Sequence, residues 1–346
     1  MKIEIITYSW SNNLGALIQS YCLKNYIIQN FNYEVFFNSY SSRSLISRER
    51  KSQINRENLP KIFYILRKKF ILYQWKKKIL NLNKPSKNSS FSSSGISLYG
   101  SDEIWNFSSP IVKKDLHYFG ALDEKKKISY AVSFGSASLS DEYKKKDFEK
   151  YLKKFDAISV RDDNSQLIIE ELTGKKVPIV LDPCFLFDEE IEEYTNNYLQ
   201  KILLKNFILI YGEKFDEKDI QQIKSIAVEK KMYILSVSYF NRWADYNLLD
   251  IDPFQFIFLI KKSSMVFTSM FHGVMLSYKY KKQFWIIKDP YRENKLNFFL
   301  NNLSLKDRFL EDYCDSILDY KKSEKKFLNW IDNSKKFLSQ NLVLKH

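Results

Sequence analysis

Short apolar runs alternate with longer helical patterns along most of this chain, and this alternation constrains the fold more than any other feature. Residues 3–8 form an apolar run fit for a buried parallel strand, and residues 16–29 carry a helical pattern. Residues 33–38 have the pattern of a second strand. This order predicts a βαβ unit with a right-handed crossover, and therefore a parallel sheet.

The same rhythm continues through both halves of the chain. Further strands of a six-stranded first sheet are predicted at residues 96–99, 128–134, 155–160 and 177–181. The second half predicts strands at 207–211, 232–237, 265–268 and 284–287, with helices at 217–230, 253–262, 271–280 and 292–302. The fold class is α/β, with two Rossmann-like parallel-sheet domains facing a cleft. We place them at residues 1–190 and 191–346, joined near 189–205, and the last helix can pack back on the N-terminal domain.

Composition narrows the function classes. Three widely spaced cysteines, Cys22, Cys184 and Cys314, fit neither a disulfide framework nor a zinc cluster and indicate a reducing compartment. With three histidines in 346 residues, we expect no metal site and no cofactor. The apolar runs are shorter than the roughly 20 residues that span a bilayer, and a charge interrupts the N-terminal run. The expected location is the cytoplasm.

The chain is basic, with 55 Lys and Arg against 41 Asp and Glu, a net charge of +14. Such a surface attracts polyanions and anionic lipid, but no nucleic-acid recognition pattern accompanies it, so we expect no nucleic-acid partner. Residues 59–82 form a basic, aromatic helical insertion in the N-terminal domain, followed by a Ser-rich loop at 86–94. The insertion could lie peripherally on the inner face of an anionic membrane, or its apolar stripe could pack on its own domain.

Ligands of open α/β sheets bind beyond the carboxyl ends of the strands. Asn12, Asn13 and Gly15 follow the first strand and precede a helix whose N-terminus could hold an anion. Asparagine also caps helices for stability alone, and both interpretations are open.

The turn after the third predicted strand combines small, acidic and aromatic residues, which suits a sugar. Trp105 could stack on a pyranose ring, Asp102 could accept a hydroxyl proton, and Ser101 lies beside them. The alternative is that Asp102 caps a helix and Trp105 is buried.

Two further strand ends carry charged or titratable side chains. Arg161 has the group best shaped for carboxylate or phosphate, although Asp162 beside it allows a plain ion pair. His272 lies where a buried strand gives way to a helix, between Ser269 and Gly273, and could donate and recover a proton. A lone histidine is more often structural, but its place at a strand end favours a function.

Together these residues resemble the polysaccharide pyruvyl transferase family. The resemblance rests on Asn-x-Gly-Ala at 13–16, Gly-Ser-Asp-x-Ile-Trp-Asn at 100–106, Tyr-Ala-x-Ser-Phe-Gly at 130–135, Ser-Val-Arg at 159–161, Leu-Asp-Pro at 181–183 and Ser-x-Phe-His-Gly at 269–273. It implies a GT-B-like fold and transfer of a pyruvyl group from phosphoenolpyruvate to two hydroxyls of a bacterial surface polysaccharide or lipid-linked glycan precursor, as a ketal.

The resemblance also implies roles for individual residues. It makes His272 and Asp102 catalytic and Arg161 the anion clamp, facing His272 across the cleft. Ser269, Gly273 and Arg292 would bind the donor, and the substrate would meet Asn12, Asn13, Gly15, Ser101 and Trp105.

One departure from the family pattern concerns the donor. Several members carry an arginine two residues before the histidine, where this chain has Met270, so that Lys288 or Arg292 would have to replace it. The alternative function is a GT-B glycosyltransferase that uses a nucleotide sugar, with Arg161 on the diphosphate. A non-catalytic module that binds membranes or nucleic acid through residues 61–78 would explain the charge alone.

Overall fold

The computed structural model describes residues 1–40, 47, 62–82, 95–109, 115–121, 123, 125–138, 146–189 and 206–343, with the backbone alone at 146–147 and 290–295. The predicted Ser-rich loop at 86–94 lies outside these residues. The chain divides into two compact units. Unit 1 comprises residues 1–59, 74–188 and 326–346, and unit 2 comprises residues 60–73 and 189–325.

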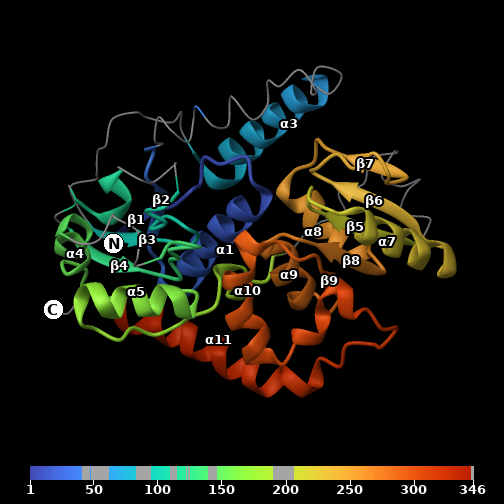
Figure 1. Ribbon diagram of the computed structural model, residues 1–346. Helices are drawn as coiled ribbons and strands as arrows, with labels where there is room; N and C mark the ends of the chain where they lie inside the picture. Colours follow the sequence, from blue (N-terminus) through green and yellow to red (C-terminus); the bar gives the residue numbers. More distant parts are fainter. Residues whose placement is uncertain are drawn as a thin grey trace. The chain divides into compact units, whose positions relative to one another are not determined.

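Unit 1 contains a parallel four-stranded sheet (Figure 1). Its strands, in the order β2-β1-β3-β4, are β1 (Lys2–Ile6), β2 (Glu34–Phe37), β3 (Ile96–Tyr99) and β4 (Lys126–Ser129). Helix α1 (Leu14–Phe31) connects β1 to β2, which run parallel, so the predicted βαβ opening is confirmed. The apolar runs of β1 and β3 are buried, as continuous apolar patterns in parallel sheets require, whereas only Phe37 is buried in the edge strand β2.

The six-stranded first sheet was wrong in one respect. Residues 155–160 and 177–181 align in parallel beyond β4, but only through isolated bridges such as Ile128 with Ala157 and Val160 with Ile179. The ladder is interrupted at Ala131, which has a φ of 52° and donates its backbone N–H to the hydroxyl of Ser159 at 3.4 Å. Side-chain hydrogen bonds therefore replace part of the expected strand pairing.

Helices complete unit 1. They are α4 (Lys146–Leu152), α5 (Asp163–Thr173) and most of α11 (Lys321–Asn341), with 3-10 turns at Leu116–Phe119 and Pro183–Phe185. Helix α11 begins in unit 2 and continues in unit 1. There Trp330 donates its indole N–H to the carbonyl of Ile179 at 3.0 Å, and the Ser334 hydroxyl accepts from the backbone N–H of Leu181 at 2.9 Å.

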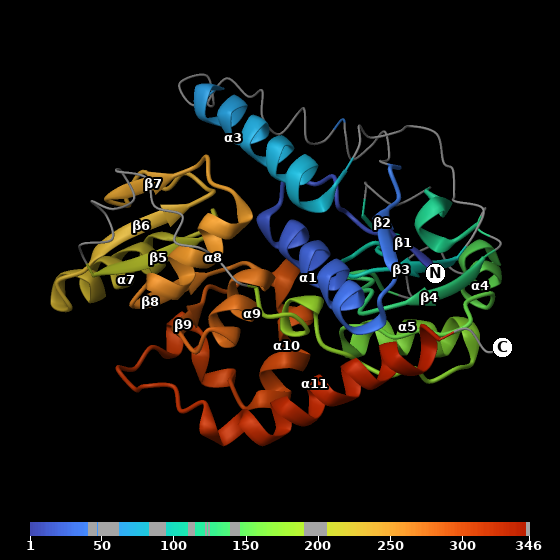
Figure 2. The same ribbon diagram turned by 180° about the vertical axis from the view of Figure 1, so that it is seen from behind.

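Unit 2 contains a parallel five-stranded sheet in the order β7-β6-β5-β8-β9, seen from both sides in Figures 1 and 2. Its strands are β5 (Phe207–Tyr211), β6 (Tyr233–Val237), β7 (Tyr246–Leu248), β8 (Met265–Thr268) and β9 (Gln283–Ile286). Its helices include α7 (Glu217–Glu229), α8 (Pro253–Lys262), α9 (Phe271–Lys279) and α10 (Pro290–Leu303). Strand β7 was not predicted, because three residues carry too little pattern. The α/β class with two parallel sheets is confirmed.

Local chemistry sets the ends of the unit 2 helices. Helices α7 and α8 both begin with a capping box, in which Asp216 pairs with Asp219 and Asp252 with Gln255. Pro253 occupies the first turn of α8, where its missing N–H costs nothing. Such signals are readable in the sequence, and the predicted bounds of α8 agree with the observed ones.

Helices cover both faces of the unit 2 sheet. Ile208 and Ile210 belong to one buried cluster with Ile223 and Ile226 of α7. Tyr211 points to the other face, because side chains alternate along a strand, and its ring lies 4.4 Å from that of Phe256 in α8. Because both faces are covered, the polar groups of this sheet that could meet a ligand lie in the loops at the strand ends.

Helix α3 (Ile62–Trp75), continued by a π-helical turn at Lys76–Leu80, forms the insertion. The sequence assigned residues 59–82 to the first domain, but residues 60–73 belong to unit 2. The guanidinium of Arg67 lies 2.8 Å from the carboxylate of Asp250, and the Lys68 ammonium donates to the Ser238 hydroxyl at 2.6 Å. These polar contacts join residues far apart in the sequence and hold residues 60–73 to unit 2. None of the described helices is long and apolar enough to cross a bilayer.

His117 makes unit 1 sensitive to mild acid. Its imidazole is buried, with its ring 4.1 Å from that of Tyr40, and burial lowers the pKa of His117 to about 3. In the unfolded chain His117 is protonated as the pH falls below about 6.5, whereas in the folded chain it stays neutral. The free energy of unfolding therefore falls as pH falls below that value. Between pH 7.5 and pH 5 we expect a loss on the order of 2 kcal/mol from this group. Denaturant unfolding of His117→Phe at the two pH values should show a loss of unfolding free energy that is smaller by this amount. A loss as large as that of the wild-type protein contradicts the assignment.

Candidate functional site

The carboxyl edge of the unit 1 sheet is a buried polar network. Ser101 is fully buried, and its hydroxyl donates to Asp182 at 3.2 Å while its carbonyl accepts from the hydroxyl of Thr7 at 3.0 Å. Gln19 of α1 donates to the same hydroxyl of Thr7 at 3.0 Å. The prediction that Ser101 meets substrate is wrong, because its side chain is enclosed and orders the loop instead.

Arg161 is held by carboxylates of its own unit. One terminal nitrogen lies 3.1 Å from Oδ2 of Asp182, and the other lies 3.7 Å from Oδ1 of Asp102. The Arg161 and Asp182 side chains are buried, whereas that of Asp102 is 18% exposed. Two carboxylates balance the guanidinium charge, so the geometry favours an internal ion pair over a clamp for a donor anion. That Arg161 faces His272 stays a prediction.

Asp102 lies at this edge and is partly exposed. Its φ is 82°, and its carboxylate accepts from the backbone N–H of Glu103 at 2.9 Å. No described helix begins at Asp102, so the capping alternative does not apply. An ionised carboxylate with one side open can accept a hydroxyl proton.

The residues before α1 have structural roles in this geometry. Asn13 caps the helix by accepting from the N–H of Ala16 at 3.1 Å, and Gly15 is buried in the first turn. Asn12 accepts at 3.0 Å from the ammonium of Lys76, which also donates to the carbonyl of Trp10. The sequence did not single out Lys76, because one basic residue among seven in the insertion looks like a solvated charge.

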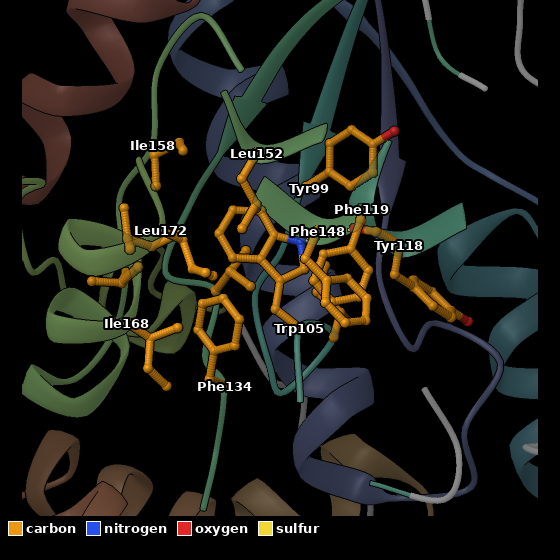
Figure 3. Close-up of a cluster of buried hydrophobic side chains, with 14 of the residues drawn as sticks. Tyr99, Trp105, Tyr118, Phe119, Phe134, Phe148, Leu152, Ile158, Ile168 and Leu172 are labelled. Atoms are coloured by element: carbon orange, nitrogen blue, oxygen red, sulfur yellow. Dashed lines mark hydrogen bonds between the residues drawn. The ribbon is translucent and has the colours of Figure 1, made fainter. Parts of the chain in front are cut away.

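Trp105 belongs to the core of unit 1 and not to a sugar site. Figure 3 shows its indole among the aromatic side chains of that core, including Phe119 and Phe134. It is fully buried, and its N–H donates to the carbonyl of Tyr118 at 2.8 Å. The prediction that Trp105 stacks on a sugar is wrong, since both its face and its polar atom are already satisfied inside the protein.

The turn between β8 and α9 concentrates polar groups at the carboxyl edge of the unit 2 sheet. The hydroxyl of Thr268 donates to the carbonyl of Tyr211 at 2.6 Å and accepts from the N–H of Met270 at 3.0 Å. A methyl group at Gly273 would overlap this hydroxyl, so glycine is needed there for packing. The hydroxyl of Ser269 is buried and has no hydrogen-bond partner among the described residues.

His272 is the second residue of α9. Its side chain is 8% exposed, and its ring meets that of Phe271 edge-on with centroids 5.2 Å apart. Met270 precedes the helix and makes no side-chain capping bond. The first backbone N–H groups of a helix lack intrahelical partners and form its positive end, so this turn combines a proton-transfer group with an anion-binding feature.

Two neighbouring strand ends extend this polar edge. Asn241, after β6, donates to the carbonyl of Gly212 at 2.9 Å and to the hydroxyl of Ser236 at 2.8 Å. Gly212 follows β5, and a methyl group there would crowd the Ser269 hydroxyl at 2.5 Å. Lys68 of α3 brings an ammonium group to the same edge through Ser238. No local pattern could have predicted this, because the partners lie 170 positions apart.

The expected substitutes for the missing arginine are placed less favourably. Lys288 is ion-paired with Glu311 and lies 5.6 Å from the ring centroid of Phe309. Arg292 lies in α10, and its side chain is outside the described part, so its donor role stays a prediction. Lys68 differs from Lys288 in its place, because its ammonium donates to the hydroxyl and the carbonyl of Ser238, directly after β6 at the carboxyl edge of the sheet.

Two other features of the molecule do not form a comparable site. A surface depression of about 530 Å³ is lined by Tyr233, Ile234 and residues of α7. It lies at the amino end of β6, the end opposite to the one where ligands of such sheets bind. In the described part of the chain, no group of three or more His, Cys, Asp or Glu side chains could hold a metal ion.

Comparison with known proteins decides the family. The sequence profile described as polysaccharide pyruvyl transferase matches residues 13–289, which is most of the chain. The chain belongs to the polysaccharide pyruvyl transferase family. This transferase therefore acts on glycans, and the matched segment carries both the Ser101–Asp102 turn and the Ser269–His272 turn. No protein of curated function matches the sequence.

Solved structures similar to this pyruvyl transferase family member have the GT-B fold. A putative UDP-N-acetylglucosamine 2-epimerase from Listeria monocytogenes is 10% identical, with 98% of this chain and 91% of that chain covered and a TM-score of 0.51. The UDP-GlcNAc 2-epimerase from Neisseria meningitidis, bound to UDP-GlcNAc, is 9% identical, with coverages of 100% and 95% and a TM-score of 0.50. At such identities the likeness concerns the fold alone.

Proposed function

We propose that this protein transfers the pyruvyl group of phosphoenolpyruvate to two hydroxyls of a glycan, forming a cyclic ketal. The acceptor would be a bacterial surface polysaccharide or its lipid-linked precursor in the cytoplasm. The observation that carries the proposal is the turn before α9, where a buried hydroxyl without a described partner, the positive end of a helix and His272 follow one another. An anionic donor and a proton-transfer step need these three features together.

In the proposed reaction, the two protons of the acceptor hydroxyls are both accounted for. His272 gives a proton to the methylene carbon of phosphoenolpyruvate while a sugar hydroxyl attacks the adjacent carbon. The bond to the phosphate oxygen then breaks, and a second hydroxyl attacks the same carbon to close the ketal. One of the two hydroxyl protons returns to His272 and replaces the proton that His272 gave to the new methyl group. The other hydroxyl proton leaves with phosphate. We propose Asp102 as the base on the acceptor side.

The donor would be held by unit 2. Phosphate or carboxylate accepts hydrogen bonds from the first N–H groups of α9 and from the Ser269 hydroxyl. We assign the missing cation to Lys68, whose ammonium lies at the end of β6. This role replaces the clamp expected of Arg161, whose charge is balanced by Asp102 and Asp182.

Ser269→Ala tests this donor site, because it should weaken donor binding without lowering the stability of the protein. The alanine removes a buried hydroxyl that has no described partner, so the free energy of unfolding should stay level or rise by about 1 kcal/mol. The KM for phosphoenolpyruvate should rise about 10- to 100-fold, as expected for a lost hydrogen bond to a charged group. Lys68→Ala should also raise this KM.

Phosphate release with phosphoenolpyruvate and candidate acceptors measures these changes, and thermal shifts report binding. Ser277→Ala is the matched control, because this buried hydroxyl in α9 already donates to the carbonyl of Gly273. An unchanged KM in Ser269→Ala means that the donor lies elsewhere. Stabilisation by nucleoside diphosphates without stabilisation by phosphoenolpyruvate replaces the proposal with a nucleotide-sugar glycosyltransferase.

A further inference from the structure

Helix α3 exposes an unusual amount of apolar surface. Its exposed large apolar side chains include Phe63 at 65%, Phe70 at 62% and Leu66 at 57%, with Ile62 at 40% and Tyr73 at 38%. One of the two alternatives that the sequence left open was packing of the apolar stripe on its own domain. That holds for Leu72 and Trp75, which are buried, but it is wrong for these five residues, and they define the apolar face of α3.

The five residues share one side of the helix. At about 100° per residue, positions 62, 66, 70 and 73 fall within one narrow sector, and position 63 lies at its border. Arg67 and Lys68 lie outside this sector, and their bonds to Asp250 and Ser238 hold that part of the helix to unit 2. The apolar face is therefore oriented to solvent by contacts made from the rest of the helix.

The charges around the apolar face have one sign. Residues 59–82 contain seven Lys and Arg, at positions 61, 67, 68, 69, 76, 77 and 78, and no Asp or Glu. Lys69 lies next to the apolar sector, and Lys77 and Lys78 are exposed in the turn that continues the helix. Apolar residues with basic ones beside them are the pattern of a helix that lies in the interface of an anionic bilayer.

We infer that α3 docks the protein on an anionic membrane surface, with the apolar face in the headgroup boundary and Lys69, Lys77 and Lys78 on the lipid phosphates. A second copy of this chain is a poorer occupant, because it carries the same net charge of +14 and would bring like charges together. The inference concerns a surface distinct from the donor site. It can be tested without substrate, so its failure and that of the proposed function are separable.

The test is co-sedimentation of the full-length protein with vesicles of equal parts phosphatidylcholine and phosphatidylglycerol, against pure phosphatidylcholine. The wild-type protein should bind the anionic vesicles, and salt should weaken the binding. The triple variant Phe63→Ser, Leu66→Ser, Phe70→Ser should lose at least about tenfold in partition, because it removes the inserted side chains. Replacing Lys69, Lys77 and Lys78 by Gln should reduce partition by about fivefold per lysine.

A matched control removes equally exposed apolar side chains elsewhere. Leu167, Val228 and Ile317 are 61%, 80% and 82% exposed, and their triple replacement by Ser should leave vesicle binding unchanged. Circular dichroism checks that every variant is folded. Equal binding by wild type and the α3 triple variant overturns the inference. A second outcome also overturns it. In that outcome the wild-type protein forms a concentration-dependent dimer in sedimentation, and the α3 triple variant is monomeric but still binds vesicles.

Discussion

His272→Gln is expected to lower the turnover of pyruvyl transfer by about 100- to 10,000-fold, the usual contribution of a positioned acid or base. Glutamine keeps hydrogen-bonding capacity at the start of α9 but cannot exchange a proton. The hydroxyl of Ser269 and the helix N-terminus are left in place, so the KM for phosphoenolpyruvate should change little. Steady-state phosphate release at saturating donor measures both values.

The control for this variant is His117→Phe. Both imidazoles are buried, but His117 packs against Tyr40 in unit 1 and has no part in the proposed reaction. Its replacement should leave turnover within about twofold near neutral pH, since surviving folded protein reacts normally. Turnover in His272→Gln that stays within about tenfold of wild type excludes His272 as the acid, whereas a large rise in KM alone makes it a binding residue.

Arg161→Met is expected to cost about 3–5 kcal/mol of the free energy of unfolding, the largest effect on stability that we predict. The reason is the carboxylate left behind, because the side chain of Asp182 is fully buried beside the lost guanidinium. The hydroxyl of Ser101 and the N–H of Cys184 still donate to Asp182, but neither carries a charge. Urea unfolding followed by fluorescence measures the loss.

The double variant Arg161→Met, Asp182→Asn separates a structural role from donor binding. The asparagine is neutral and its Oδ1 can still accept from the Cys184 N–H, so most of the lost stability should return. The KM for phosphoenolpyruvate should then stay near its wild-type value. A stable double variant with a KM raised more than about tenfold would restore Arg161 as the donor clamp, and a single variant as stable as wild type contradicts the buried ion pair.

Several elements could be predicted closely because their signals are local. The strands β3, β5 and β8 and the helix α8 have the predicted bounds. Each strand is a short apolar run between polar turns, and α8 begins with an aspartate cap and a proline. The motif turns at residues 100–106 and 269–273 could be found for the same reason, because ligand-binding turns follow strand ends in this fold.

The roles of particular side chains could not be predicted in the same way. Trp105 has the residue type of a sugar platform, yet only its packing against Phe119, Phe134 and Phe155 shows that it belongs to the core. Arg161 has the shape of an anion clamp, but Asp182 already pairs with it. In each case the deciding neighbour is distant in sequence, and residue type alone does not tell buried from exposed.

For this protein, the amino-acid sequence by itself determined the alternation of strands and helices, the class of two parallel sheets and the family, because these depend on local pattern and on short motifs. Only the tertiary structure decided that Lys68 reaches the end of β6, that the Ser269 hydroxyl is enclosed without a described partner and that one face of α3 is exposed. Burial and pairing depend on which segments pack together, and packing joins residues that the sequence keeps far apart.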